Sequence, residues 1–483
     1  MTTFREKFKK FILRVFRISK EQEYNIEREF DFQSNALKNS LWYDGDAYEL
    51  AQFYQHTGNH NRSFWGSKES KGNEIRRIHT GLPALIVDTL TNITAKDIDS
   101  VNFEDEKCAK IWEQLEKDIS FTDEIAELTK TGLVIGDGGV KFTFDLDISK
   151  TPKLEVVPGD RMEPVYQRGN LKELKFYTHY TVNNKEYMLE ETYGYGYIKY
   201  ILFDKVGHVC DLNAIPQTNG LEDIEFDNKI ILAVPFKFFN STKYKDRGKS
   251  IYEGKTDAFD AVDECVSQWL DALRAGRVKT YIPETLIPRD ANAGYLLKPN
   301  AFDNRFIAVG ADMSEKANNQ INTVQPDIKT DAYLQTYITV LDIALQGLIS
   351  PSTLGIDNKK LDNAEAQREK EKATLYTRAA IIESLENISK AVVQGYFDTL
   401  SIMHNTSRIE AAADVQFGEY ANPSFEAVVE VMSNPNTPMS IEAKVEEIWG
   451  DSKSEEWKKE EVQRIKNERG IVSLDEPALG LAV

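Results

Sequence analysis

The chain has 483 residues, enough for two to four domains, and 41% of them are hydrophobic, which is typical of a folded protein with a sizeable core. It contains no run of eighteen apolar residues, so no membrane span is expected. Its three cysteines, Cys108, Cys210 and Cys265, are far apart, odd in number and without metal-ligand spacing, which argues against a disulfide framework and for a reducing compartment. The net charge of −19 is unlike that of proteins that hold nucleic acid tightly by neutralising its phosphates.

The N-terminal segment is the basic exception in this acidic chain. Between Arg5 and Lys20 there are seven basic residues and one acidic residue, interleaved with aromatic and aliphatic side chains. A basic amphipathic helix of this kind could lie on a membrane, resemble a targeting peptide, or dock on an acidic neighbour. It has no continuous apolar region and no small-residue cleavage site, so we favour the docking arm over a secretory signal.

Residues 21–130 are expected to be largely helical. Within them, Ile75–Ile93 carries a helical apolar pattern, and Pro83 predicts that this helix is kinked or starts late. The glycine-rich run Gly132–Gly139 suggests a phosphate-binding loop. However, it has neither the Gly-Lys-Ser/Thr ending nor the GxGxxG spacing, and we interpret it as a turn.

From Val140 onward, apolar and polar residues alternate, which is the period of a β-strand. The pattern predicts an antiparallel sheet of several strands, separated by Gly, Pro and Asn. The strand candidates are Val140–Ile148, Leu154–Val157, Leu174–Val182, Tyr187–Thr192, Tyr197–Phe203 and Ile230–Phe239. The run Tyr193–Tyr197, with glycine between its tyrosines, could stack on a ligand but is more typical of a structural element.

An amphipathic helix is predicted from Tyr252 to Ala275, and it ends at Gly276. Its apolar face and its acidic residues are expected to lie on different sides. The apolar face comprises Phe259, Val262, Val266, Trp269 or Leu270, and Leu273; the acids on the other faces are Asp257, Asp260, Asp263, Glu264 and Asp271.

A small module, Arg277–Pro326, follows this helix and contains two strand candidates, Val278–Ile282 and Phe306–Val309. A second helix is predicted over Asp327–Leu348, where Leu334, Ile338, Leu341, Leu345 and Leu348 form an apolar stripe. Because the two helices leave and return to one small module, we expect them to form an antiparallel pair.

Proline and glycine in Gly347–Gly355 end the second helix, and a third pattern of strong helix formers runs from Asn363 to His404. It contains no proline and one glycine, Gly395. At this length the helix would span about 60 Å. It is therefore expected either to brace a large body or to form a coiled-coil arm.

The C-terminal part returns to helix after a short strand candidate, Asp414–Gly418. Helices are predicted over Phe425–Met432 and Ser440–Trp449, with Ser440 in a capping position. From His404 onward there are sixteen acidic residues against eight basic ones, which indicates an acidic lobe.

No catalytic or metal-binding motif stands out. His56 and His60 could share a helix face, but no HExxH frames them and Gly58 lies between them. Asp145 and Asp147 would share one strand face, where they could bind a divalent ion, although adjacent solvent-facing acids are commoner. The chain has no GxSxG, no Cys–His pair at a family spacing and no Walker signature, so we expect no enzyme, no catalytic residue, no cofactor and no metal.

The order of these parts resembles that of the portal (head-to-tail connector) proteins of tailed bacteriophages, most of all those of long-tailed phages of Gram-positive hosts. The resemblance covers essentially the whole chain. Its quoted pieces are Asp271–Arg277 at the end of the first helix, Tyr281–Glu284 in the small module, Arg247–Glu253 before the first helix, and the loop and long helix that follow Leu348.

The resemblance implies an α+β fold with the portal architecture, assembled as a ring. Its parts would be an N-terminal arm and wing (1–250), a first stem helix (251–276), a small α/β clip (277–326), a second stem helix (327–348), a tunnel loop (349–363), a long wing helix with a return strand (364–420) and a helical crown (421–483).

The resemblance also implies a function. Members of the family form a dodecameric ring at one capsid vertex, through which terminase pumps double-stranded DNA and through which the DNA later leaves. The implied partners are further copies of the chain, the terminase large subunit, a head-completion or adaptor protein, and the major capsid and scaffold proteins, with no membrane. The implied location is the virion, after assembly in the host cytoplasm. An acidic channel would let DNA slide, because each Lys–phosphate contact adds affinity and friction.

Two sets of site residues follow from the resemblance. In the tunnel loop, the candidates for facing DNA are Ser350, Ser352, Thr353, Lys359 and Lys360, although the two lysines could merely solvate a flexible loop. In the clip, the candidates for docking terminase or an adaptor are Tyr281, Glu284, Arg289 and Arg305. The alternatives are a helical scaffold that binds proteins only and, less favoured, a metal-dependent enzyme with its site near Asp145.

Overall fold

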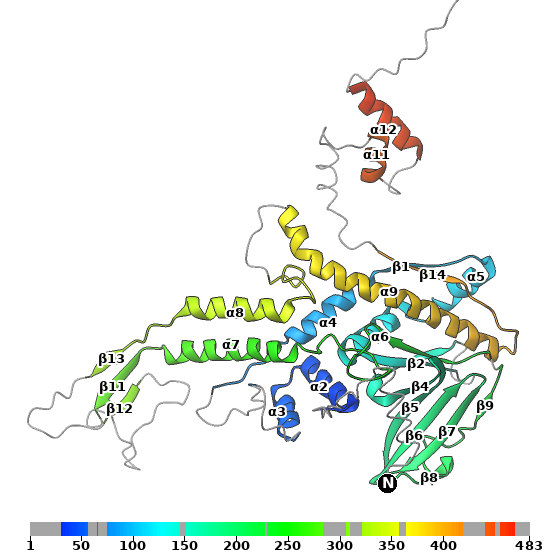
Figure 1. The fold of residues 1–483 in the computed structure, drawn as a ribbon, viewed down its shortest axis with the longest axis horizontal. Helices are drawn as coiled ribbons and strands as arrows, with labels where there is room; N and C mark the ends of the chain where they lie inside the picture. Colours follow the sequence, from blue (N-terminus) through cyan, green and yellow to red (C-terminus); the bar gives the residue numbers. More distant parts are fainter. Residues whose placement is uncertain are drawn as a thin grey trace, which may run out of the picture. The chain divides into compact units, whose positions relative to one another are not determined.

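The computed structural model of the chain combines helices and open sheets in an α+β fold, as predicted (Figure 1). The chain divides into two compact units, Met1–Gln416 and Phe417–Val483, which are described separately. The described residues are 30–56, 65, 75–144, 151–227, 229–283, 306–309, 321–356, 364–418, 440–449 and 455–468. The N-terminal arm, His60, Asp145, Asp147 and the helix predicted over Phe425–Met432 lie outside them.

The N-terminal part is largely helical, as predicted. Its helices are α2 (Phe32–Asp44), α3 (Ala47–His56), α4 (Leu82–Asn92), α5 (Glu106–Leu115) and α6 (Phe121–Ile135). Helix α4 starts late, with Pro83 in its first turn, where a missing N–H removes no helical hydrogen bond. Strand β1 (Ile98–Phe103) was not predicted; it pairs with β14 (Ala413–Phe417), the strand expected near Asp414.

The turn predicted over Gly132–Gly139 is wrong in extent. Helix α6 continues to Ile135, Gly136 alone makes the turn with a φ of 117°, and strand β2 (Asp137–Thr143) begins directly after it. The other glycines serve close packing: a Cβ at Gly138 would overlap the ring of Phe236. Glycine there reflects crowding between α6 and its sheet.

The predicted strands form two antiparallel sheets rather than one. The first has the order β10-β2-β3, and Val140 lies opposite both Val156 and Val234. The second has the order β4-β5-β6-β7-β8, with β9 also paired to β7. Their bounds are β3 (Lys153–Pro158), β4 (Met162–Gln167), β5 (Asn170–Val182), β6 (Lys185–Gly194), β7 (Tyr197–Asp204), β8 (Val209–Cys210), β9 (Ile224–Glu225) and β10 (Ala233–Lys237).

The Tyr193–Tyr197 run is structural, as predicted. Tyr193 is fully buried, and Tyr197 donates a hydrogen bond to Glu173 (2.8 Å). A Cβ at Gly194 would overlap the Tyr197 ring, so this turn accepts only glycine there.

The predicted long helix is α9 (Ala364–Met403), and it braces the body of the first unit (Figure 1). Arg378 ties it to the end of α4 by donating to the Ile93 carbonyl (2.7 Å) and to Asp97 (2.6 Å). Ser384 donates to the Phe238 carbonyl near β10 (3.2 Å). These contacts, and a buried apolar stripe from Ile381 to Phe397, exclude a free arm for this part of the helix.

The second unit contains α11 (Ile441–Trp449) and α12 (Glu455–Glu468). Ser440 caps α11, as predicted, by accepting a hydrogen bond from the Ala443 N–H (3.1 Å). The rings of Trp449 and Trp457 join the two helices edge to face, with centroids 5.2 Å apart.

Two sequence-level expectations about the whole chain concern cysteines and membranes. Cys108, Cys210 and Cys265 are all described, and none is in a disulfide. Among the described helices, none combines the length and apolarity needed to cross a membrane.

Candidate functional site

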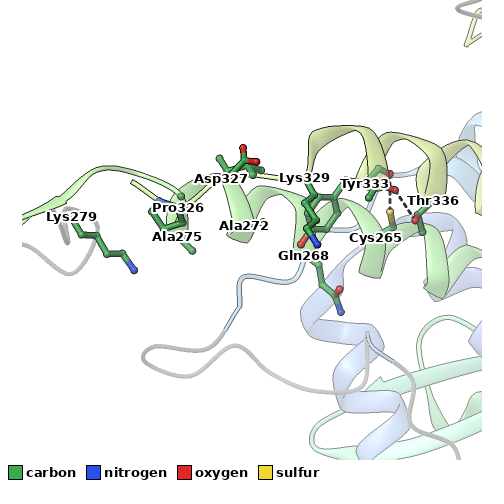
Figure 2. Close-up of a pocket in the computed structure, with 13 residues that line it drawn as sticks. Cys265, Gln268, Ala272, Ala275, Lys279, Pro326, Asp327, Lys329, Tyr333 and Thr336 are labelled. Carbon is green, nitrogen blue, oxygen red and sulfur yellow. Dashed lines mark hydrogen bonds between the residues drawn. The ribbon is translucent and has the colours of Figure 1, made fainter. Parts of the chain in front are cut away.

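The two helices around the small module form an antiparallel pair, as predicted (Figures 1 and 2). They are α7 (Thr256–Ala275) and α8 (Thr330–Leu345). Midway along the pair, the ring of Trp269 stacks on Tyr333 with centroids 6.2 Å apart. The Cys265 thiol lies 3.9 Å from the Tyr333 carbonyl.

The two ends of the pair are fixed by further contacts. At the start of α7, the Lys255 ammonium donates to the carbonyls of Ile343 (3.0 Å) and Gln346 (2.7 Å) at the end of α8. These carbonyls are among those that a helix end leaves without partners, so a cation there is favourable. At the other end, a Cβ at Gly276 would overlap Ile328, so glycine allows the two chains to approach closely.

The acidic residues of α7 are not all on its outer faces, and the prediction for Asp260 and Asp263 is wrong. Both are buried. Asp263 accepts hydrogen bonds from the N–H (2.8 Å) and hydroxyl (2.7 Å) of Thr80, and Asp260 accepts one from the Trp65 N–H (2.7 Å). Burying a carboxylate is tolerable when such donors replace water. The acids therefore fasten the segment before α4 to α7.

Burial also changes the titration of this region. Loss of solvent raises the pKa of Asp263 to about 6, although the hydrogen bonds from Thr80 act in the opposite direction. His79 lies 3.8 Å away (Nε2 to Oδ2), and burial lowers its pKa. The two groups therefore titrate closer together than they would in water.

The segment before α7 anchors the helix pair to the sheets. Arg247 makes two 2.8 Å hydrogen bonds to the carboxylate of Asp137 in β2, and the Gly248 N–H donates a third (2.7 Å). Tyr252, expected in the helix, instead precedes it and donates to the Pro83 carbonyl (2.8 Å). The Arg247–Glu253 run is thus a structural joint.

The small module contains a three-stranded sheet of order β12-β11-β13. Its strands are β11 (Lys279–Pro283), β12 (Phe306–Val309), which is parallel to β11, and the unpredicted β13 (Asn322–Val324), which is antiparallel to it. Tyr281 is half-buried on the central strand. Glu284, Arg289 and Arg305 lie outside the described residues, so docking through these four residues stays a prediction.

The first part of the predicted tunnel loop is folded against α9. The N–H of Ser350 donates to the Thr374 hydroxyl (2.8 Å), and the hydroxyls of Thr353 and Thr374 lie 2.9 Å apart. Ser350, which is itself buried, also contacts the hydroxyl of Ser352 (2.6 Å). These three loop residues are thus occupied by contacts within the chain. The sequence gave no sign of Thr374, which sits among ordinary helix formers.

Lys359 and Lys360 lie outside the described residues. Contact between DNA and any of the five loop residues stays a prediction.

The helix pair has an exposed apolar surface and a hollow. Leu270 and Leu273 of α7 are each 40% exposed, and Leu334 of α8 is 39% exposed. The hollow, of about 610 Å³, lies between the helices and the strands that leave them (Figure 2). Neither feature has a partner among the described residues that would fill or cover it.

Comparisons with known proteins give two structural similarities. No family model and no curated protein matches the chain. A structure described as the neck of a native GTA particle, computed with C12 symmetry, has 15% identity and a TM-score of 0.38, over 80% of this chain and 90% of its own. A second, the neck of an empty GTA particle computed with C6 symmetry, has 14% identity and a TM-score of 0.39, over 76% and 90%.

TM-scores below 0.5 do not establish a common fold. The functional proposal below therefore depends on the chain's own features.

No catalytic or metal site emerges from the part of the chain that the structure describes. Within it, no three His, Cys, Asp or Glu side chains are grouped so that they could hold a metal ion. The polar groups that the structure does bring together, such as Asp137 with Arg247 or Asp263 with Thr80, join elements of the fold.

Proposed function

We propose that this chain is a portal protein: its copies form a ring at one capsid vertex, and double-stranded DNA enters and leaves through the channel of that ring. The observation that carries the proposal is the α7–α8 pair, an antiparallel two-helix stalk with a small sheet at its far end. In a portal this unit is the stem with its clip. The loop and long helix that follow occupy the matching places of the tunnel loop and the wing helix.

The exposed leucines of the stalk support assembly. Leu270, Leu273 and Leu334 leave apolar surface in water along a helix pair that is otherwise firmly anchored. Burial stabilises such surface by roughly 25 cal/mol per Å². A surface of this kind marks a protein interface. In a closed ring, every copy would bury it against a neighbour.

The charge supports passage of DNA rather than binding. Each chain carries a net charge of −19, so a ring would be strongly negative. Lys–phosphate contacts release counterions and strengthen binding, so a channel with few of them offers little friction. We propose that Lys359 and Lys360, which follow the part of the loop anchored at Thr374, make the transient phosphate contacts.

The remaining partners are assigned by place in the chain. The clip, with Tyr281 on its central strand, would dock the terminase large subunit before filling and a head-completion or adaptor protein afterwards. The basic N-terminal arm would meet the capsid or scaffold. The chain itself would not be an enzyme, since ATP hydrolysis would belong to terminase, and its place would be the virion.

Two experiments test the proposal. Negative-stain microscopy of the purified protein should reveal rings with a central opening wide enough for a DNA duplex; particles without one would refute the portal assignment. Deletion of residues 350–357 should impair genome packaging or retention in assembled heads. Unchanged packaging and retention would remove the loop's role but leave the ring intact.

A further inference from the structure

We propose that neighbouring copies join head to tail along the stalk: Leu270 and Leu273 of one copy fill the hollow between α7 and α8 of the next. This inference rests on the proposed function, because it names the surfaces by which the ring would form. The occupant of the hollow is thus a second copy of this chain.

The hollow exists because small residues face each other across the two helices. Ala272, Ala275 and Gly276 line it from α7, and Ala332 lines it from α8. With no longer side chains to meet between the helix axes, about 610 Å³ stays unfilled (Figure 2). Interiors are normally packed with few voids, so an apolar hollow of this size on a stalk calls for an occupant.

The leucines lie on the opposite side of the same helix. With 3.6 residues per turn, Cys265, Gln268 and Ala275 of the hollow fall within an arc of about 80° on α7. Leu270 and Leu273 are centred about 150° away from that arc. The helix therefore presents a hollow on one side and projecting leucines on the other.

Helix α8 repeats this division. Ala332, Tyr333 and Thr336 face the hollow, whereas the exposed Leu334 is about 150° from their centre. Because the helices are antiparallel and Trp269 stacks on Tyr333 between them, Leu334 falls on the same side of the pair as the α7 leucines. One side of the stalk is thus concave and the other side projects.

This arrangement selects a head-to-tail contact. A two-fold dimer would place the same surface of each copy against itself, pairing leucines with leucines and leaving both hollows open. A head-to-tail contact uses one hollow and one set of leucines from each copy, so it repeats until the ring closes. The complementary surfaces belong to one chain, which favours a second copy over a different protein as the occupant.

Disulfide cross-linking tests the contact directly. In the double variant Leu273→Cys/Ala275→Cys, one cysteine lies on the projecting side and the other at the hollow, too far around the helix to pair within one copy. Mild oxidation should give a reducible ladder of dimers, trimers and higher species on a denaturing gel. The wild-type chain and the Ala275→Cys single variant are the controls and should give no ladder. A product that stops at the dimer would indicate a two-fold interface and overturn the proposal.

A charge substitution gives a second measurement. Leu273→Asp should raise the protein concentration for half-assembly at least about tenfold, whereas Leu37→Asp, at a leucine of α2 that is 52% exposed, should leave it unchanged. Circular dichroism checks that both variants fold. Rings that persist in Leu273→Asp, or wild-type rings whose double variant gives no ladder, would refute this contact but not the portal proposal. A wild-type chain that stays monomeric would refute both.

Discussion

Gly395 offers a test in which local helix propensity and tertiary packing predict opposite signs. It is the one glycine of the forty-residue α9, where alanine would be preferred by about 1 kcal/mol. However, a Cβ at this position would overlap the ring of Phe142 in β2. That ring is buried edge to face against Tyr396, with centroids 5.2 Å apart. Tyr396 is in turn held by its 2.5 Å hydrogen bond to Glu124.

The packing effect should win. Forcing an extra methyl group into a well-packed core typically costs about 1–3 kcal/mol, and the fixed ring places this site at the upper end. After the gain in helix propensity, Gly395→Ala should lower the free energy of unfolding by about 2 kcal/mol. Urea unfolding followed by circular dichroism, at one protein concentration for all variants, measures it.

A double-mutant cycle separates the two effects. Phe142→Leu removes most of the ring that the new methyl group would meet, so Gly395→Ala should be much less harmful in that background. A coupling energy of at least about 0.5 kcal/mol is expected. If Gly395→Ala alone made the protein more stable, α9 would not be packed against β2 as described.

Three further predictions concern buried polar groups. Asp137→Asn should lower the free energy of unfolding by about 3–5 kcal/mol in urea, because it leaves the Arg247 guanidinium buried without its counter-charge. For Asp263, the raised pKa means that the folded state holds a proton that the unfolded state releases between about pH 4 and pH 6, so wild-type stability should fall across that window. Asp263→Asn does not titrate, and should gain up to about 3 kcal/mol on the wild type between pH 4 and pH 7, measured by urea unfolding at each pH. Thr374→Val leaves the buried Ser350 N–H without its acceptor, and hydrogen exchange at this amide should accelerate by an amount that corresponds to about 1–3 kcal/mol.

Exposed groups provide the controls. Glu186 and Lys205 form a 3.0 Å ion pair in which both side chains are mostly exposed. Glu186→Gln should change stability by no more than about 1 kcal/mol, because solvent screens such pairs. Equal losses in Asp137→Asn and Glu186→Gln would contradict the buried joint between β2 and the segment before α7.

Much of the helical architecture could be predicted because its signals are local. The long helix α9 follows from forty residues of helix formers between a proline-containing loop and a strand. Pro83 correctly indicated the late start of α4, and Ser440 the cap of α11. The antiparallel α7–α8 pair followed from the length of the module between the two helices.

What could not be predicted depends on partners far away in the sequence. Asp260 and Asp263 were expected at the surface, since nothing near them in sequence reveals that Trp65 and Thr80 donate hydrogen bonds to them. Strand β1 was hidden in a helical region, because its partner β14 lies about three hundred residues later. Non-local contacts of this kind override local pattern.

The candidate site shows the same division. The sequence indicated the loop after α8 through its proline and glycines, but not that Thr374 would hold Ser350 in a buried position. It also placed Leu270 and Leu273 among the candidates for the apolar face of α7, yet they are exposed, while the small residues Ala272 and Ala275 line a hollow. An apolar stripe alone does not tell whether its partner is the same chain or another copy.

The molar mass of the purified protein in solution, measured by multiangle light scattering, tests the central claim most directly. One chain has a mass of 55.0 kDa. The ring predicts a single species near twelve times that mass, stable on dilution through the micromolar range. A mass of one or two chains at every concentration would contradict it.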